Sequence, residues 1–198
     1  VEVRYSPAEH DEYGEQENYI DNCVKVVSRV SKNEPPGDML VFLPTERDIR
    51  TCSEMLNKRV TNAEILPLFG RLHATDQKKI FQPAKRTKIV VATNVAETSI
   101  TVPGIRYVID SGLARIPFYN FKAKTNSLPI QKISRASCNQ RKGRCGRVGP
   151  GICIRLYEEE DFLERDEFSI PEIKRSNLAE VILQMRSFKL GDPYRFPF

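Results

Sequence analysis

The sequence lacks the two elements that every self-sufficient nucleoside triphosphatase of the phosphate-loop type needs. It contains no G-x-x-x-x-G-K-[S/T] pattern, and no Gly-Lys dipeptide occurs anywhere in its 198 residues. No apolar strand ends in an Asp-Glu pair, since Asp11-Glu12 and Asp166-Glu167 lie in polar stretches. The loop would supply the backbone amides and lysine that hold a triphosphate, and the acidic pair would hold the metal. The chain alone is therefore excluded as a complete enzyme of that class.

Patterns for metal binding, secretion and membrane insertion are also missing. The five cysteines form no C-x-x-C pair, and only two histidines are available to join them. No apolar run approaches the roughly 20 residues that span a bilayer, and no signal peptide opens the chain. We expect no metal site, reduced thiols and a cytoplasmic protein. The opening Val1-Glu2-Val3-Arg4 and the closing Phe196-Pro197-Phe198 suggest a fragment of a longer chain.

Acidic residues are absent from one long window, Ser111 to Tyr157. Inside it, residues 140–147 read Gln-Arg-Lys-Gly-Arg-Cys-Gly-Arg, so that glycines alternate with arginines and let several guanidinium groups approach one object. Guanidinium groups match phosphate oxygens and keep their charge at neutral pH. With a net charge of +5, the pattern predicts an anionic partner, nucleic acid or nucleotide. A solvated basic face without a partner is the alternative. The basic residues of the window are Arg115, Lys122, Lys124, Lys132, Arg135, Arg141, Lys142, Arg144, Arg147 and Arg155.

Cys145 lies between arginines of this window. It is either a reactive thiol with a lowered pKa or a small residue that fills a tight turn, and the second reading is favoured.

Short apolar runs alternate with amphipathic segments along the chain. This alternation predicts an α/β fold, with a parallel sheet covered by helices on both faces. Between residues 115 and 135 the period changes to two, which predicts a protruding antiparallel β-hairpin with its turn at Thr125-Asn126, outside the central sheet. Strands are expected at 1–5, 39–43, 63–69, 88–92, 105–110 and 151–156. Helices are expected at 17–30, 46–58, 76–81, 135–147 and 178–188.

Polar residues follow several of the apolar runs directly. Thr93-Asn94, Pro44-Thr45 and Gly70-Arg71 each come after an expected strand, and Thr45 is also a plausible N-cap. Because ligands of parallel α/β sheets bind beyond the carboxyl ends of the strands, these residues are candidates for binding.

Two of these segments carry a family resemblance. Ala92 to Thr101, reading ATNVAETSIT, and Gln140 to Arg147 resemble the fifth and sixth motifs of DEAH-box RNA helicases, and the strand at residues 40–43 is similar to the fourth motif. The chain resembles the second RecA-like lobe of such a helicase, most similarly to the bacterial HrpA subgroup. The resemblance extends from the entry strand to about Phe188.

The resemblance implies a RecA-like lobe at residues 1–170, with the hairpin at about 115–135, followed at 171–198 by a linker and the first helix of a winged-helix domain. It implies the second motor lobe of an ATP-dependent, 3'-to-5' RNA helicase that is inactive alone. A passive nucleic-acid-binding module without a role in ATP hydrolysis is the alternative.

The resemblance also implies residues that act on a nucleotide. In such helicases the first lobe, missing from this chain, holds ATP or another nucleoside triphosphate with Mg²⁺, and the second lobe closes on it. By this analogy Arg144 and Arg147 are arginine fingers. Gln140 positions the attacking water, and Gly143 permits the close approach.

Further positions match the nucleotide's base and sugar. Phe81 matches a base-stacking aromatic, although without the resemblance it would be read as a core residue. Ser99 and Thr101 match hydroxyls near the magnesium and ribose. Pro103 stands where many members carry an Asp for the ribose, so we expect loose choice among nucleotides.

Other matching positions contact the backbone of single-stranded RNA, with DNA left open as a further partner. Such contacts carry no sequence information, so binding is expected to be sequence-tolerant and salt-sensitive. The first lobe and the C-terminal domains of the same protein are the other implied partners, and no membrane is. Asn94 has turn capping as an alternative role, and Arg141 is open between finger and backbone grip. The residues expected to bind RNA are Thr93, Asn94, Arg71, Gly70, Thr45 and Arg135.

Overall fold

The computed structural model describes residues 1–9, 17–120, 124–147, 149–192 and 195. The chain divides into two compact units. The first comprises residues 1–114 and 130–169, and the second comprises residues 115–129 and 170–198.

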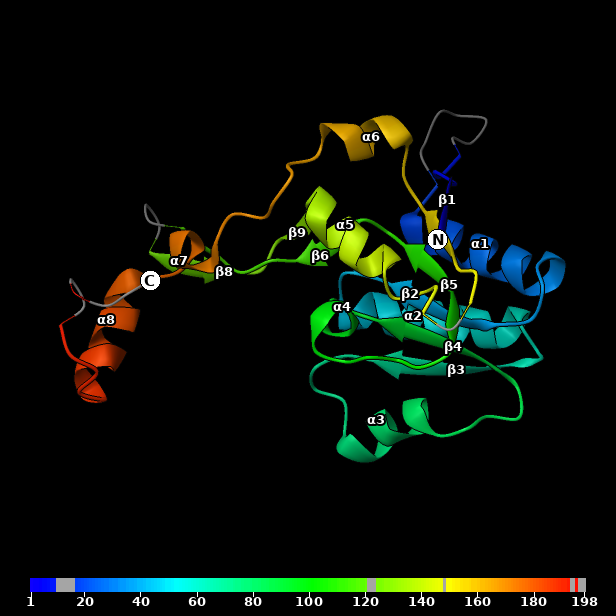
Figure 1. Ribbon diagram of the computed structural model, residues 1–198, viewed down its shortest axis with the longest axis horizontal. Coiled ribbons are helices and arrows are strands. Elements are labelled where there is room, and N and C mark those ends of the chain that lie inside the picture. Colours follow the sequence, from blue (N-terminus) through cyan, green and yellow to red (C-terminus); the bar gives the residue numbers. More distant parts are fainter. Residues whose placement is uncertain (10–16, 121–123, 148, 193–194, 196–198) are drawn as a thin grey trace. The chain divides into compact units, whose positions relative to one another are not determined.

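The first unit is built on a six-stranded sheet with the order β1-β10-β5-β2-β4-β3, in which every neighbouring pair is parallel (Figure 1). Its central strands are mostly apolar because both of their faces are covered. This confirms the expected parallel sheet. The strands are β1 (Glu2–Tyr5), β2 (Asp38–Phe42), β3 (Ala63–Leu68), β4 (Thr87–Ala92), β5 (Ile105–Asp110) and β10 (Ile152–Arg155).

Helices connect these strands, and several of them begin at a side chain that caps the first turn. Thr45 accepts a hydrogen bond from the Asp48 amide at 3.1 Å, as expected of an N-cap, and Ser134 caps its helix in the same way through Ser137. The helices of this unit are α1 (Tyr19–Asn33), α2 (Glu46–Arg59), α3 (Ala74–Phe81), α4 (Val95–Thr98), α5 (Arg135–Lys142) and α6 (Glu159–Glu164).

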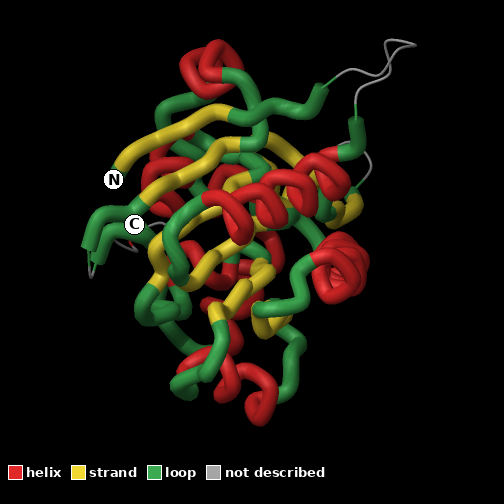
Figure 2. Tube along the Cα trace, turned by 90° about the vertical axis from the view of Figure 1, so that its right-hand side faces the viewer, coloured by secondary structure: helices red, strands yellow, loops and turns green. Residues whose placement is uncertain are grey.

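Two apolar cores lie on opposite faces of the sheet. On one face α1 and α2 pack through residues such as Val27 and Leu56 against Val41 of β2. On the other, Ile80 of α3 and Ala96 of α4 belong to a second cluster. The strands consequently lie between helices, as Figure 2 shows with strands in yellow and helices in red. The expected helices on both faces are confirmed.

Two local expectations are wrong. The helix predicted for 135–147 ends at Lys142, because the chain turns at Gly143 and Gly146 has a φ of +79°, which no α-helix contains. Thr125 and Asn126 are not the hairpin turn but strand residues, since Thr125 pairs with Asn120 and Asn126 with Tyr119. Lys124, directly before them, adopts a φ of +51°.

The second unit contains the hairpin, which lies outside the central sheet as predicted, and two helices. The guanidinium of Arg175 donates to the carbonyl oxygens of Ile170 at 2.8 Å and Pro117 at 3.0 Å, which ties the helical segment to the base of the hairpin. In the part of the chain that the structure describes, no helix has the length and apolarity to cross a membrane. The remaining elements are β6 (Leu113–Arg115), which pairs with β9 (Ile130–Lys132), the antiparallel pair β7 (Phe118–Asn120) and β8 (Thr125–Ser127), and the helices α7 (Glu172–Arg175) and α8 (Leu178–Ser187).

Candidate functional site

The arginine loop, which we define as residues 143–147, leaves the end of α5. Arg144 is half-buried, and its Nη2 donates to the backbone carbonyl of Glu97 in α4. Burial and then the positive charge of Arg147 lower the pKa of the Arg144 guanidinium, so the two charges lie close enough to repel each other. Arg147, Gln140 and Gly143 are exposed. The loop therefore presents Arg147 to solvent, whereas Arg144 is held against α4.

The two glycines of the loop differ in what the fold requires of them. A Cβ on Gly146 would lie 2.5 Å from Val1 Cγ2, at a φ of +79°. A Cβ on Gly143 would meet nothing closer than the Gln140 carbonyl oxygen at 3.4 Å. The fold thus requires glycine at position 146 but not at position 143.

Alanine at these positions is expected to separate the two requirements. Gly146→Ala should destabilise the chain by about 1–2 kcal/mol because of its left-handed backbone. Gly143→Ala should leave stability unchanged or raise it by about 0.4–1 kcal/mol, since its φ of −68° suits alanine. Urea unfolding of this chain followed by circular dichroism measures both. If both variants lost the same free energy of unfolding, the fold itself would require glycine at position 143.

Arg141 is buried completely, so it fits neither of the two roles considered for it, arginine finger or grip on the nucleic-acid backbone. Its Nη1 donates to Asp110 Oδ1 at 2.7 Å, and its Nε donates to Glu97 Oε2 at 3.1 Å. Nη2 donates to the Leu113 carbonyl at 3.1 Å, and the guanidinium lies 4.7 Å from the centroid of the Phe42 ring. Arg141 is therefore neither an arginine finger nor a phosphate grip; it is an internal ion-pair centre. We call Glu97, Asp110 and Arg141 the ionic cluster.

Other members of the acid-free window differ in exposure: Arg155 is buried, Arg135 is half-buried and Lys132 is exposed. Arg155 is 2% exposed, lies 3.8 Å from the centroid of the Phe162 ring and donates to the Tyr5 hydroxyl. Lys132 pairs with Asp161 at 2.7 Å. Arg135 is half-buried, and its backbone amide donates to the Asp166 carbonyl. The window is thus not one basic surface, because Arg141 and Arg155 are buried in the interior.

The expected nucleic-acid residues gather at one edge of the sheet. The Thr93 amide donates to the Leu68 carbonyl at 3.1 Å and the Leu43 amide to the Ala92 carbonyl at 2.9 Å, so the ends of β3, β4 and β2 lie side by side. This strand-end edge carries Gly70, Arg71, Thr93, Asn94 and Thr45.

Exposure on this edge favours contact with a ligand. Gly70, Arg71 and Asn94 are exposed, whereas Thr93 and Thr45 are half-buried. Asn94 occupies the N-cap position of α4, but its side chain makes no capping hydrogen bond, so the capping alternative does not explain it. The hydroxyl of Thr45 does cap α2.

The residues expected near the nucleotide fall on the α3–α4 face of the sheet. Phe81 ends α3 and is 47% exposed, whereas the preceding Ile80 is fully buried. The core reading of Phe81 is therefore wrong. Ser99 and Thr101 are exposed and follow α4, whose Glu97 carbonyl accepts the hydrogen bond from Arg144. The structure thus brings the Ser99 segment beside the arginine loop.

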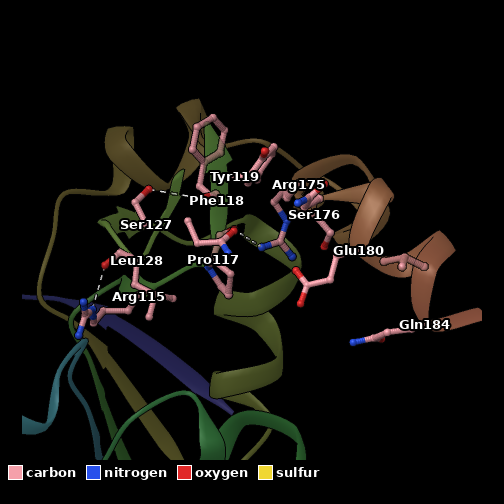
Figure 3. A pocket seen from close by; sticks show the side chains of 13 residues that line it. Arg115, Pro117, Phe118, Tyr119, Ser127, Leu128, Arg175, Ser176, Glu180 and Gln184 are labelled. Atoms are coloured by element: carbon pink, nitrogen blue, oxygen red, sulfur yellow. Dashed lines mark hydrogen bonds between the residues drawn. The ribbon is translucent and has the colours of Figure 1, made fainter. Parts of the chain in front are cut away.

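The second unit holds an open pocket of about 640 Å³ between the hairpin and the α7–α8 segment (Figure 3). Phe118, Leu128, Arg175 and Val181 contribute to its lining. The described lining includes none of the residues that the sequence predicted to bind nucleotide or RNA. The exposed apolar residues of α8 and the hairpin could have signalled it.

Sequence reasoning also missed Glu97 and Asp110. Glu97 is the only acid between Ala92 and Thr101, and Asp110 closes a buried strand just before the acid-free window. Both features mark a carboxylate that needs an internal partner.

The cysteines are structural. All five are free and buried, and burial raises the pKa of the Cys145 thiol, so the reading of Cys145 as a small residue in a turn is supported and its reactivity is not. Within the described residues, no group of three or more His, Cys, Asp or Glu side chains is placed to hold a metal ion.

The chain was compared with known proteins. The family model of the helicase conserved C-terminal domain matches residues 18–149. The "ATP-dependent RNA helicase HrpA" of Escherichia coli K12 is 52% identical over 199 residues, and its homologue from Haemophilus influenzae is 54% identical; each match covers 100% of this chain.

The E. coli DEAH/RHA helicase HrpB is similar in structure, with a TM-score of 0.88 and 33% identity over 98% of this chain and 24% of that one. The chain spans 15% of the length of the two curated relatives.

Proposed function

The chain belongs to the family of helicase conserved C-terminal domains, and from this premise we propose that it is the second motor lobe of an ATP-dependent RNA helicase of the HrpA, DEAH-box type. In this proposal ATP is held by a first lobe, and the present chain supplies the arginines that complete the site. The observation that carries the proposal is the arginine loop: it presents Arg144 and Arg147 beside α4, in a chain whose sequence has no phosphate loop.

The donor set fits phosphate and not magnesium. Guanidinium, hydroxyl and amide groups bind anionic oxygens, whereas Mg²⁺ prefers carboxylates and water. Glu97 and Asp110, the two carboxylates of the ionic cluster, are already engaged by Arg141. Mg²⁺ would therefore be held by the first lobe, where it would neutralise negative charge of the phosphates.

The chain's own residues then have distinct tasks. Arg147 and Arg144 stabilise the negative charge that spreads over the γ-phosphate oxygens during transfer. Gln140, exposed on the last turn of α5, orients the attacking water. Ser99 and Thr101 contribute hydroxyls beside the arginine loop.

The strand-end edge binds single-stranded RNA in this proposal. Thr93, Asn94 and Arg71 contact sugar and phosphate groups, so binding tolerates any sequence and weakens with salt. Opening and closing of the two lobes, driven by hydrolysis, would move the strand past this edge in the 3'-to-5' direction.

Phe81 is expected to set nucleotide affinity without choosing the base. Phe81→Ala should weaken nucleotide binding about 5- to 150-fold in the full-length protein, since stacking on an aromatic ring contributes about 1–3 kcal/mol per base. ATP, GTP, CTP and UTP should lose affinity to a similar extent, because each base has a π-face. Phe81→Tyr should retain the affinity. Fluorescent-nucleotide titration checks this, and unchanged affinity in Phe81→Ala would contradict the stacking role.

The proposed function is tested by ATP turnover with and without single-stranded RNA. The isolated chain should show no turnover, whereas the full-length protein that contains it should show RNA-stimulated turnover. RNA binding by the full-length protein without any ATP turnover would instead establish the passive nucleic-acid-binding module.

A further inference from the structure

Three contacts from α5 and the arginine loop converge on Glu97. Its Oε1 accepts a hydrogen bond from the Ser137 hydroxyl at 2.6 Å, and its Oε2 accepts from Arg141 Nε at 3.1 Å. Its backbone carbonyl accepts from Arg144 Nη2. Glu97 is 7% exposed, so these contacts form with little competition from water.

The same residue is tied to the strand-end edge. The Glu97 amide donates to the Asn94 carbonyl at 2.9 Å, within a helix of only four residues. A single helical turn has little rigidity of its own, because nucleation fixes several dihedral angles for one hydrogen bond. The position of α4 is therefore set by its partners, and the strongest of these is the buried Arg141.

The ionic cluster holds α4 in one position relative to α5 and β5. Arg141 is completely buried and spans Glu97 and Asp110, so moving α4 away would leave a charge unpaired in the interior. A displacement of Asn94 is consequently transmitted to the Glu97 carbonyl, on which Arg144 is docked.

We propose that Glu97 is a positioning residue for Arg144, through which contact at the strand-end edge sets the placement of the arginine loop. The proposal rests on the proposed function, since it gives the arginine loop a catalytic task. According to this proposal, the Glu97 carboxylate contributes to the stimulation of ATP hydrolysis by RNA, although it touches neither RNA nor nucleotide.

The test compares Glu97→Gln with the wild type in the full-length protein. The amide keeps the size of the side chain but removes its charge, so the grip on Arg141 weakens. The RNA-stimulated kcat should fall about tenfold, within the range of coupling energies known for such networks, while the KM for ATP and the Kd for single-stranded RNA change less than about twofold. Glu54→Gln, an exposed carboxylate on α2, is the matched control and should be silent.

A double variant separates positioning from a merely structural role. If Glu97 acts through Arg144, Glu97→Gln should add no further loss of kcat in an Arg144→Ala background. Ser137→Ala, which leaves the ion pairs intact and removes one hydrogen bond to Glu97, should lower kcat by a smaller factor and serves if Glu97→Gln folds poorly.

Two results would overturn the inference but not the proposed function. The first is a double variant whose kcat falls by the product of the two single-variant factors. The second is wild-type kcat in both Glu97→Gln and Ser137→Ala, with a lowered kcat in Arg144→Ala. A full-length wild type without RNA-stimulated turnover, or an Arg144→Ala variant with full turnover, overturns the proposed function and the inference together.

Discussion

Replacing Arg147 with alanine in the full-length protein is expected to lower ATP turnover by about 10³- to 10⁵-fold, the factor that an arginine finger contributes. Arg147 is exposed, so it is placed to reach a triphosphate held by another lobe. Arg144→Ala should also reduce turnover, because this arginine belongs to the same loop and is placed there by its hydrogen bond to the Glu97 carbonyl. Single-turnover hydrolysis at saturating ATP and RNA measures the effect on chemistry directly.

The matched control is Arg71, an arginine of the strand-end edge. Arg71→Ala should weaken the affinity for single-stranded RNA and flatten its salt dependence, yet retain turnover at saturating RNA. Arg59→Ala, an exposed arginine at the end of α2, should change neither quantity. If Arg147→Ala instead lost RNA affinity and recovered full turnover at saturating RNA, the arginine loop would be a phosphate grip, and the passive-module alternative would hold.

The largest effect on stability is expected from Arg141→Ala. Removing one partner of a buried ion pair typically costs about 3–5 kcal/mol, because the other charge stays buried without compensation. Here two carboxylates, one on each side of the guanidinium, would lose their partner, and the Phe42 ring would lose the group that lies over it. Urea unfolding of this chain gives the loss as a shift of the midpoint.

Arg141→Lys should recover only a small part of that loss. An ammonium group cannot donate in the fixed fork that reaches Glu97, Asp110 and the Leu113 carbonyl together. Arg147→Ala should stay within about 0.5 kcal/mol of the wild type, as exposed substitutions usually do. Equal stability of Arg141→Ala and Arg147→Ala would refute the structural role given to Arg141.

The sheet could be predicted from the sequence because its strands are apolar on both faces, and each such run is bounded by polar or turn residues. The strand-end edge followed from the same pattern, since parallel strands end together. The end of α5 could not be predicted: Gly143 has helical dihedral angles, and only the positive φ of Gly146 excludes a longer helix.

The sequence also could not show which of the arginines would be buried. Arg141, Arg144 and Arg147 have the same chemistry and even spacing, yet the first is internal and the last exposed. What distinguishes them is the position of acids 44 and 31 residues away in the chain, Glu97 and Asp110, whose contact with Arg141 exists only after folding. Residue type and local pattern cannot report such a distant pairing.

The edge strand β1 has a mechanical consequence. It lies parallel to β10, in register from Glu2 opposite Ile152 to Tyr5 opposite Arg155, and Gly146 faces Val1 at its start. A force applied at Val1 along the strand loads the hydrogen bonds of this ladder together, as in shear, whereas a force across the sheet would break them one after another. This edge of the sheet should therefore resist a pull along the strand better than a pull across the sheet.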